Sequence, residues 1–174
     1  MEIEVTPEAG PAAVVDRLDQ SADPQVYFPV PGLELASLRD WSQEGGAGEG
    51  QQGAVLAQVN NTELAIFRYG ERVLATAARC PHLGGPLHLG DIEVLPDQSL
   101  CVRCPWHRWA FTVGGAGPDS TRRQLFPGRQ PGQCVSPPGR SARLDTFPAT
   151  TSASGQVRVG FSSFHSRTLT EETF

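Results

Sequence analysis

Proline and glycine interrupt this sequence so often that long helices have little room in it. The 15 prolines and 19 glycines together make up 34 of the 174 residues. Proline lacks a backbone donor and clashes inside a helix, while glycine weakens a helix interior. Frequent interruption of this kind favours short strands joined by many turns. We therefore expect an all-β protein, built as a small antiparallel sandwich or barrel.

Several short runs of apolar and β-branched residues lie between turn residues. Residues 54–60, 62–69 and 72–78 are divided by Asn60-Asn61 and by Gly70-Glu71, which predicts a β-meander. Further strands are expected at 26–30, 100–103, 109–113, 143–147 and 156–161. The glycine-rich stretch 45–53 is interpreted as a plain loop, because no lysine follows it to bind a phosphate.

The length of the chain suits one domain with short extensions. Residues 1–26 are interpreted as an acidic N-terminal arm, 27–161 as the domain and 162–174 as a C-terminal tail. Within the domain, the segment 114–142 holds six glycines and five prolines. We expect it to be an irregular insertion.

The charge of the chain excludes some classes of function. All 14 basic residues are arginines, 19 residues are acidic, and the net charge of −5 argues against nucleic-acid binding. Residues 1–50 hold 10 acids and 2 arginines, whereas residues 101–174 hold 4 acids and 9 arginines. The acidic N-terminus and the lack of a run of about 18 apolar residues predict a cytoplasmic protein that does not insert into a membrane.

Cysteine and histidine gather in one short stretch. Of the four cysteines (Cys80, Cys101, Cys104 and Cys134), three lie within 80–107, together with His82, His88 and His107. Structural disulfides are disfavoured in a reducing compartment, so this clustering points to metal or redox chemistry.

Two cysteine–histidine pairs stand out in that stretch. Cys80 and His82 are two positions apart, and Cys104 and His107 are three apart, so each pair can converge only in a tight loop. Two thiolates and two imidazoles suit both zinc and iron–sulfur chemistry. Cys101-x-x-Cys104 would supply a zinc knuckle, whereas one mixed pair in each loop suits a [2Fe–2S] cluster.

Small residues in the loops favour the cluster. Gly84, Gly85 and the backbone N–H of Trp106 would allow a close approach to bridging sulfides and would donate hydrogen bonds that zinc does not need. A zinc-stabilised interaction module remains the competing interpretation.

The pattern Cys-x-His followed by Cys-x-x-His resembles the Rieske [2Fe–2S] proteins. Residues 80–87 and 104–107 carry this resemblance, which extends more weakly over 27–161. It implies a Rieske-like fold with a two-loop subdomain inserted in it. It also implies that Cys80 and Cys104 bind an inner iron, and that His82 and His107 bind an outer iron near the surface.

The differences within that pattern indicate one branch of the family. The respiratory members have a further cysteine in each loop, where this chain has Gly85 and Trp106. Many ferredoxin members have glycine after the second histidine, where this chain has Arg108. Trp109 and Phe111 occupy positions where the high-potential members place hydroxyl donors. The resemblance is therefore to the ferredoxin and oxygenase branch, and it implies a low redox potential.

The remaining cysteines and histidines receive structural interpretations. Cys101 lies in an apolar strand and is expected to be a small buried residue, while Cys134 is expected to be a free thiol. A Cys101–Cys134 disulfide is the alternative. His88 is interpreted as an exposed or hydrogen-bonded residue. Four arginines are expected to form a solvated face that could also steer an acidic partner: Arg103, Arg108, Arg122 and Arg123.

These observations predict a carrier of single electrons rather than an enzyme. We expect a monomer that takes electrons from a reductase and passes them to an oxygenase or another reductase. The alternative is a ferredoxin-like component that works only within an oxygenase or reductase complex. A complete oxygenase is excluded, because no second set of ligands for a mononuclear iron can be assembled.

Overall fold

The computed structural model describes residues 25–43, 53–115 and 129–162, which fold almost entirely into β-strands. The elements are β1 (Gln25–Glu34), η1 (Leu35–Ser37), β2 (Val55–Val59), β3 (Thr62–Tyr69), β4 (Arg72–Ala77), η2 (Leu87–Leu89), β5 (Asp91–Val94), β6 (Ser99–Arg103), β7 (Ala110–Gly115), β8 (Cys134–Ser136), β9 (Thr146–Phe147), β10 (Ala149–Thr151) and β11 (Gln156–Ser162). The all-β prediction is confirmed. No helix in these three ranges is long and apolar enough to cross a membrane.

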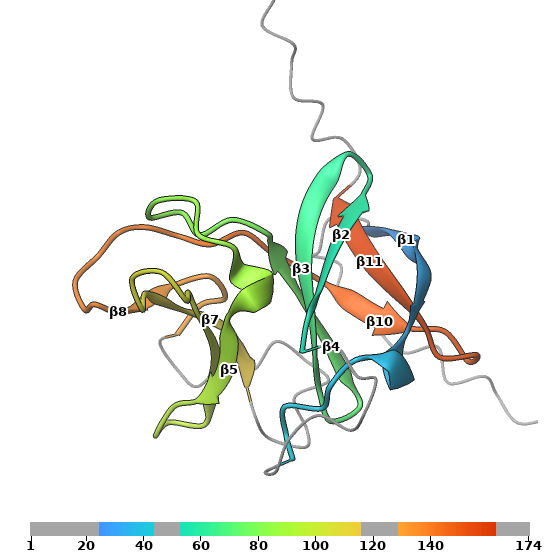
Figure 1. Ribbon diagram of the computed structural model, residues 1–174, viewed down its shortest axis with the longest axis horizontal. Coiled ribbons are helices and arrows are strands. Elements are labelled where there is room, and N and C mark those ends of the chain that lie inside the picture. The colour runs from blue at the N-terminus through green and yellow to red at the C-terminus, as the bar shows by residue number, and fades with distance from the viewer. Residues whose placement is uncertain (1–24, 44–52, 116–128, 163–174) are drawn as a thin grey trace, which may run out of the picture.

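The strands form three antiparallel sheets, ordered β1-β11-β10, β2-β3-β4-β9 and β5-β6-β7-β8. Figure 1 shows strands β5, β7 and β8 at one side of the molecule, β1, β10 and β11 at the opposite side, and β2, β3 and β4 between them. The third sheet lies between β4 and β9 in sequence. The chain then returns beside its point of departure, since Thr76 pairs with Thr146 and the Ala77 N–H donates to the Asp145 carbonyl at 2.9 Å. The β5–β8 sheet is therefore an inserted subdomain, as predicted.

Strand β3 separates two hydrophobic cores. Leu64 and Ile66 face the first core, which the β1-β11-β10 sheet covers, while Ala65 and Phe67 face the second core, beneath the inserted subdomain. All four side chains are fully buried. A strand buried on both faces shows a continuous apolar run instead of alternation. Burial of a side chain as large as Phe67 contributes about 3 kcal/mol, so this strand holds the two halves of the molecule together.

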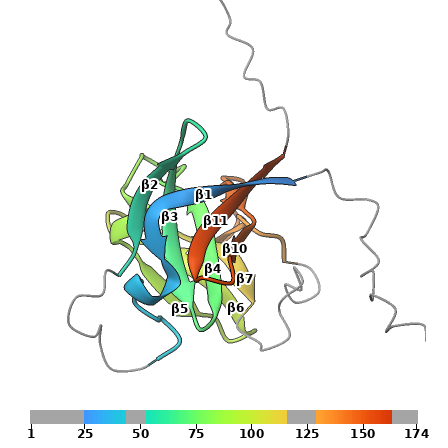
Figure 2. The same cartoon turned by 90° about the vertical axis from the view of Figure 1, so that its right-hand side faces the viewer.

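Strand β1 lies along β11 and covers the first core (Figure 2). Val30 and Leu33 are both buried, so the strand continues past Pro31-Gly32, where the sequence predicted a break. The register shifts between Pro29 and Glu34, which absorbs the disruption. The strand also starts at Gln25, inside the predicted N-terminal arm.

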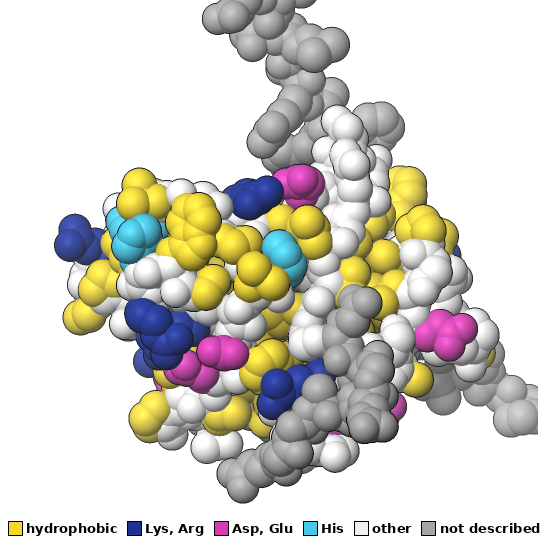
Figure 3. Space-filling view, viewed as in Figure 1, with side chains coloured by type: hydrophobic (Ala, Val, Ile, Leu, Met, Phe, Trp, Pro, Cys, Tyr) yellow, Lys and Arg dark blue, Asp and Glu magenta, His cyan; other side chains and the backbone are white. Residues whose placement is uncertain are grey.

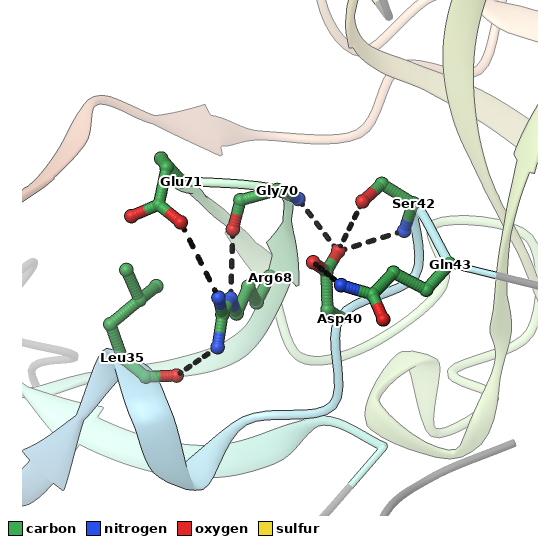
Figure 4. A network of polar contacts seen from close by, with 7 residues as sticks. All are labelled: Leu35, Asp40, Ser42, Gln43, Arg68, Gly70 and Glu71. Carbon is green, nitrogen blue, oxygen red and sulfur yellow. Dashed lines mark hydrogen bonds and ion pairs between the residues drawn. The ribbon is translucent and has the colours of Figure 1, made fainter.

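The segment after β1 is held against the turn between β3 and β4 by a polar network (Figure 4). The Asp40 carboxylate accepts hydrogen bonds from the backbone N–H of Gly70 at 2.7 Å and from the N–H and hydroxyl of Ser42 at 2.9 and 2.7 Å. Burial alone would raise the pKa of Asp40, but these bonds and the Arg68 charge outweigh it and leave the pKa lowered. Arg68 in turn donates to the carbonyls of Gly70 and Leu35.

The predicted β-meander is confirmed as β2, β3 and β4, and the predicted strands at 100–103, 109–113 and 156–161 are confirmed as β6, β7 and β11. Strand β8 lies within the segment predicted to be irregular, and β5 and β10 were not predicted. These three strands have four residues or fewer, so pairing with a neighbour rather than local pattern determines them. Most of the arm, the glycine-rich loop and the tail lie outside the described residues, as do 116–128.

Candidate metal centre

The first candidate loop follows β4 and is closed by two backbone hydrogen bonds. The Cys80 N–H donates to the Gly85 carbonyl at 2.8 Å, and the Gly84 N–H donates back to the Cys80 carbonyl at 2.8 Å. Gly84 has a φ of 75°, a left-handed conformation that glycine adopts without strain. The loop therefore turns tightly around Cys80, as the Cys-x-His spacing requires.

The second candidate loop follows β6 and is closed in the same way. The Cys104 N–H donates to the Trp109 carbonyl at 2.7 Å, and the Arg108 N–H donates to the Cys104 carbonyl at 3.1 Å. The fourth residue after each cysteine is left-handed, but here it is Arg108, with a φ of 62°. The two loops thus share one backbone design, although only the first has glycine at this position.

The two loops bring a pair of buried thiols together. Cys80 is 3% exposed and Cys104 is 1% exposed, and both belong to the second core. A Cβ atom at Gly85 would lie only 2.6 Å from the Cys104 sulfur, so only glycine lets the loops approach this closely. Burial and the neighbouring Cys104 raise the pKa of the Cys80 thiol, against the opposing backbone N–H groups of His82 and Leu83.

The two histidines lie beside each other on the outer side of the loops. The imidazole centroids of His82 and His107 are 5.1 Å apart, with the rings nearly perpendicular. The His82 Nδ1 atom is buried and has no hydrogen-bond partner among the described residues. Buried polar atoms are nearly always paired, so an unpaired imidazole nitrogen two residues along the chain from the buried Cys80 fits a metal ligand. His107 is exposed.

No three histidine, cysteine or acidic side chains converge on one point within 25–43, 53–115 and 129–162. The four predicted ligands instead form a thiol pair and an imidazole pair. Thiolates and imidazoles together suit iron–sulfur chemistry, in which two ligands hold each iron.

Aromatic residues surround His82. Trp109 stacks on its imidazole, with ring centroids 4.0 Å apart and planes 9° from parallel, and Trp109 is followed by the fully buried Phe111. Trp106, in contrast, is 58% exposed. The Arg140 guanidinium lies 5.8 Å from the Trp109 ring centroid. Sequence reasoning missed Arg140, because no motif marks it within the segment predicted to be irregular.

Cys101 and Cys134 lie apart from the candidate ligands. Both are free and buried, as predicted. Cys101 is opposite Thr112, whereas Cys134 is opposite Phe111, and successive residues of a strand point to opposite faces. The alternative of a Cys101–Cys134 disulfide is therefore wrong. Burial raises the pKa of the Cys101 thiol to about 11.

The predicted arginine face is partly neutralised. Arg103 donates to both carboxylate oxygens of Glu93 at 2.7 Å, which raises the pKa of Arg103 and lowers that of Glu93. Arg108 is exposed and lies 3.9 Å from Asp91 and 3.7 Å from Glu93. The expectation that Arg103 offers a free charge is wrong, because a carboxylate already pairs with it. Two further arginines lie outside the described residues: Arg122 and Arg123.

His88 was predicted to be exposed or hydrogen-bonded. It lies in η2 after the first loop and is half-buried, and its Nδ1 atom has no partner among the described residues. The structure does not bring it into the thiol and imidazole pairs.

The fold and the paired loops resemble those of Rieske-type iron–sulfur proteins, and comparison with known proteins agrees. Residues 48–124 match the profile of the soluble Rieske-type ferredoxins. A human Rieske domain-containing protein is 39% identical over 79 residues, which are 45% of this chain and 50% of the human protein. The matching stretch thus spans half the length of that relative. Residues 48–124 are thus similar to the soluble Rieske-type ferredoxins, which agrees with the resemblance seen in the sequence.

Solved structures show the same fold at low sequence identity. A protein from Mycobacterium tuberculosis, assigned as the small subunit of an NADH-dependent nitrite reductase, aligns with a TM-score of 0.57 at 17% identity and covers 82% of this chain and 100% of its own. The ferredoxin of carbazole 1,9a-dioxygenase from Nocardioides aromaticivorans aligns with a TM-score of 0.51 at 16% identity and covers 76% and 95%. The Rieske-type β fold is therefore confirmed.

Proposed function

We propose that this chain is a carrier of single electrons with one [2Fe–2S] cluster, held by Cys80, His82, Cys104 and His107. The observation that carries the proposal is a pair of buried thiols, one of which shares its loop with the buried, unpartnered Nδ1 atom of His82. When bound, the cluster would accept and release one electron at a time.

The residues around the four ligands each have a definite task. The backbone N–H groups of His82 and Leu83 face the Cys80 sulfur, and such donors stabilise a thiolate. Gly84 supplies the left-handed turn, and Gly85 leaves the space beside Cys104. The backbone N–H of Trp106 is proposed as a further donor to the cluster, as in the sequence-based prediction.

The edge formed by His82 and His107, called the histidine edge below, would be the route by which electrons enter and leave the cluster. His107 is exposed, whereas both thiols are buried, so a partner can approach the imidazoles but not the sulfurs. Exposed hydrophobic residues lie at the same loops, including Leu83 and Trp106. The space-filling view shows histidine and hydrophobic side chains gathered over these loops, with arginine at their border (Figure 3). Arg108 is exposed beside the second loop.

We further propose a low redox potential. Two ferric ions, two sulfides, two thiolates and two neutral imidazoles carry a net charge of roughly zero, which becomes about −1 on reduction, and Rieske centres span about −150 to +300 mV. Hydrogen bonds to the sulfurs raise the potential within that range. Trp109 and Phe111 have no hydroxyl group to offer, so the low end of the range is expected.

The proposed partners are a reductase that donates electrons and an oxygenase or second reductase that accepts them. The family match and the fold shared with a dioxygenase ferredoxin support this class of partner. On this proposal the chain is not itself an enzyme and acts as a cytoplasmic monomer, or as the ferredoxin-like component of an oxygenase or reductase complex.

Elemental analysis of protein purified without oxygen tests the proposal. We expect two irons and two acid-labile sulfides per chain, visible absorption, and an electron paramagnetic resonance (EPR) signal after reduction. Cys80→Ser and Cys104→Ser should abolish all of these. Stoichiometric zinc in a colourless protein would instead support the interaction module. A midpoint potential well above zero in protein-film voltammetry would contradict the low-potential assignment.

A further inference from the structure

Three separate segments meet at the Trp109 ring. His82 belongs to the first loop, Trp109 ends the second loop, and Arg140 lies between β8 and β9. Figure 1 shows the segment after β8 on the same side of the molecule as the β5–β8 sheet. The imidazole and indole rings are stacked at 4.0 Å, and the Arg140 guanidinium lies over the indole at 5.8 Å.

We propose that Trp109, supported by Arg140, is a positioning residue that fixes the orientation of the His82 imidazole and shields it from water. The inference rests on the proposed role of His82 as a ligand. It also assigns a task to the C-terminal part of the segment that the sequence predicted to be an irregular insertion.

Within the described residues, the His82 ring lacks the usual hydrogen-bonded support of a metal-bound histidine. A metal-bound histidine usually donates its second ring N–H to a carboxylate or carbonyl, which fixes the plane of the ring. Among the hydrogen bonds of the described residues, none involves the His82 imidazole. The parallel indole is therefore the contact that can stop rotation of this ring.

Trp109 is itself well placed for this task. Its carbonyl accepts the hydrogen bond from the Cys104 N–H, so its backbone is tied to a proposed ligand of its own loop. Its ring also contacts Phe111, with centroids 6.3 Å apart, and Phe111 is fully buried. Trp109 is thus anchored on the core and packs against His82 of the first loop, so it can hold that side chain in place.

Only one of the two histidines receives this support. His107 is exposed and meets His82 edge-on, whereas His82 is half-buried and covered on one face by the indole. The structure therefore divides the histidine edge into a fixed, shielded ring and an accessible ring.

Arg140 and Trp109 should affect the reduction potential in opposite directions. Reduction adds a negative charge, so a nearby guanidinium favours the reduced form and its loss should lower the potential. The indole keeps water from one face of His82, and water would stabilise the added charge. Loss of the indole should therefore raise the potential.

The test uses the full chain with its cluster in five forms: unaltered, Trp109→Leu, Trp109→Phe, Arg140→Gln and Arg143→Gln. Arg143→Gln is the matched control, because Arg143 is an exposed arginine of the same segment whose side chain contacts Gln130 and Pro131 instead of an aromatic ring. The readouts are iron content, the EPR line shape of the reduced protein and the midpoint potential.

We expect Trp109→Leu to broaden the EPR lines and raise the midpoint, and Trp109→Phe to restore both toward the unaltered protein. Arg140→Gln should lower the midpoint and broaden the EPR lines less than Trp109→Leu does, whereas Arg143→Gln should leave the line shape unchanged and shift the midpoint less than Arg140→Gln does. If Trp109→Leu retains too little iron to measure, the Phe and Gln variants still decide the matter.

Unchanged spectra and midpoint in Trp109→Leu, a Phe variant that behaves like the Leu variant, or equal shifts from the two arginine variants would overturn the inference. Failure of the proposed function looks different. In that case the unaltered protein itself contains no [2Fe–2S] signal.

Discussion

We predict that the folded protein is less stable with arginine at position 108 than it would be with glycine. The residue has a φ of 62°, where a Cβ atom crowds the backbone, while Gly84 has a φ of 75° at the equivalent place of the first loop. We compare Arg108→Gly with Arg108→Ala, since both remove the same side-chain contacts and differ only in the Cβ atom. The difference between the two variants therefore measures backbone strain.

The magnitude follows from two opposing effects. A left-handed conformation costs a non-glycine residue about 1–2 kcal/mol. Glycine loses about 0.5–1 kcal/mol more conformational entropy on folding than alanine. The net advantage of Arg108→Gly over Arg108→Ala should be about 1 kcal/mol, which corresponds to about 2–4 °C in Tm for a chain of this size. Loss of the exposed ion pairs to Asp91 and Glu93 adds less than about 1 kcal/mol to both variants.

Gly84→Ala provides the converse measurement. A Cβ atom added at Gly84 meets no atom within 4 Å, so its cost is backbone strain without steric contact. We expect Gly84→Ala to lower the Tm by the amount that separates the two Arg108 variants. Circular dichroism melts of the cluster-containing proteins at one scan rate provide the data. Equal Tm values for Arg108→Gly and Arg108→Ala, or a neutral Gly84→Ala, would refute the strain argument.

Three further predictions concern the surroundings of the ligands. Gly85→Ala should lose the cluster, measured as iron content, because its Cβ would lie 2.6 Å from the Cys104 sulfur; full iron content would show that the loops can separate. Cys101→Ala should keep all its iron at a cost of about 1 kcal/mol, and iron loss would identify Cys101 as a ligand. Glu93→Gln should lower the Tm by about 2–4 °C at neutral pH, for a loss of about 1 kcal/mol discounted for partial exposure. Because the pKa of Glu93 is lowered in the folded protein, its pairing with Arg103 stabilises the fold above the unfolded pKa of about 4.3 and is lost as the pH falls through the lower folded value. Plots of Tm against pH for the unaltered protein and for Glu93→Gln should therefore converge in acid. A constant gap between the two plots would argue against the ion pair.

Much of the fold could be predicted where local pattern and structure agree. The meander strands are apolar runs ended by turn residues, and Asn60 and Asn61 do adopt positive φ values in the first turn. The proximity of the two cysteine–histidine pairs was also predictable, because their spacing permits only tight loops. Gly84 and Gly85 of the first loop could also be interpreted from the sequence, because small residues allow a close approach within the site.

What could not be predicted depends on contacts between distant segments. Strand β1 continues past Pro31-Gly32 because Val30 and Leu33 both reach a core that other strands complete. Arg103 looked like a free charge, since its partner Glu93 lies ten residues away on a strand that the sequence did not reveal. The contact of Arg140 with Trp109 likewise depends on the path of the chain after β8.

The inserted subdomain leaves and rejoins the central sheet at neighbouring positions, where the Ala77 N–H donates to the Asp145 carbonyl. For protein engineering, this means that the segment between them can be treated as a cassette with one attachment point. A cassette from a Rieske-type protein with a different potential would need to match this short seam and the apolar face of β3 and β4, where Phe67 and Leu74 belong to the same core as the inserted segment. Conversely, the seam is a poor place for new sequence, because a change there would disturb the attachment of both ends at once.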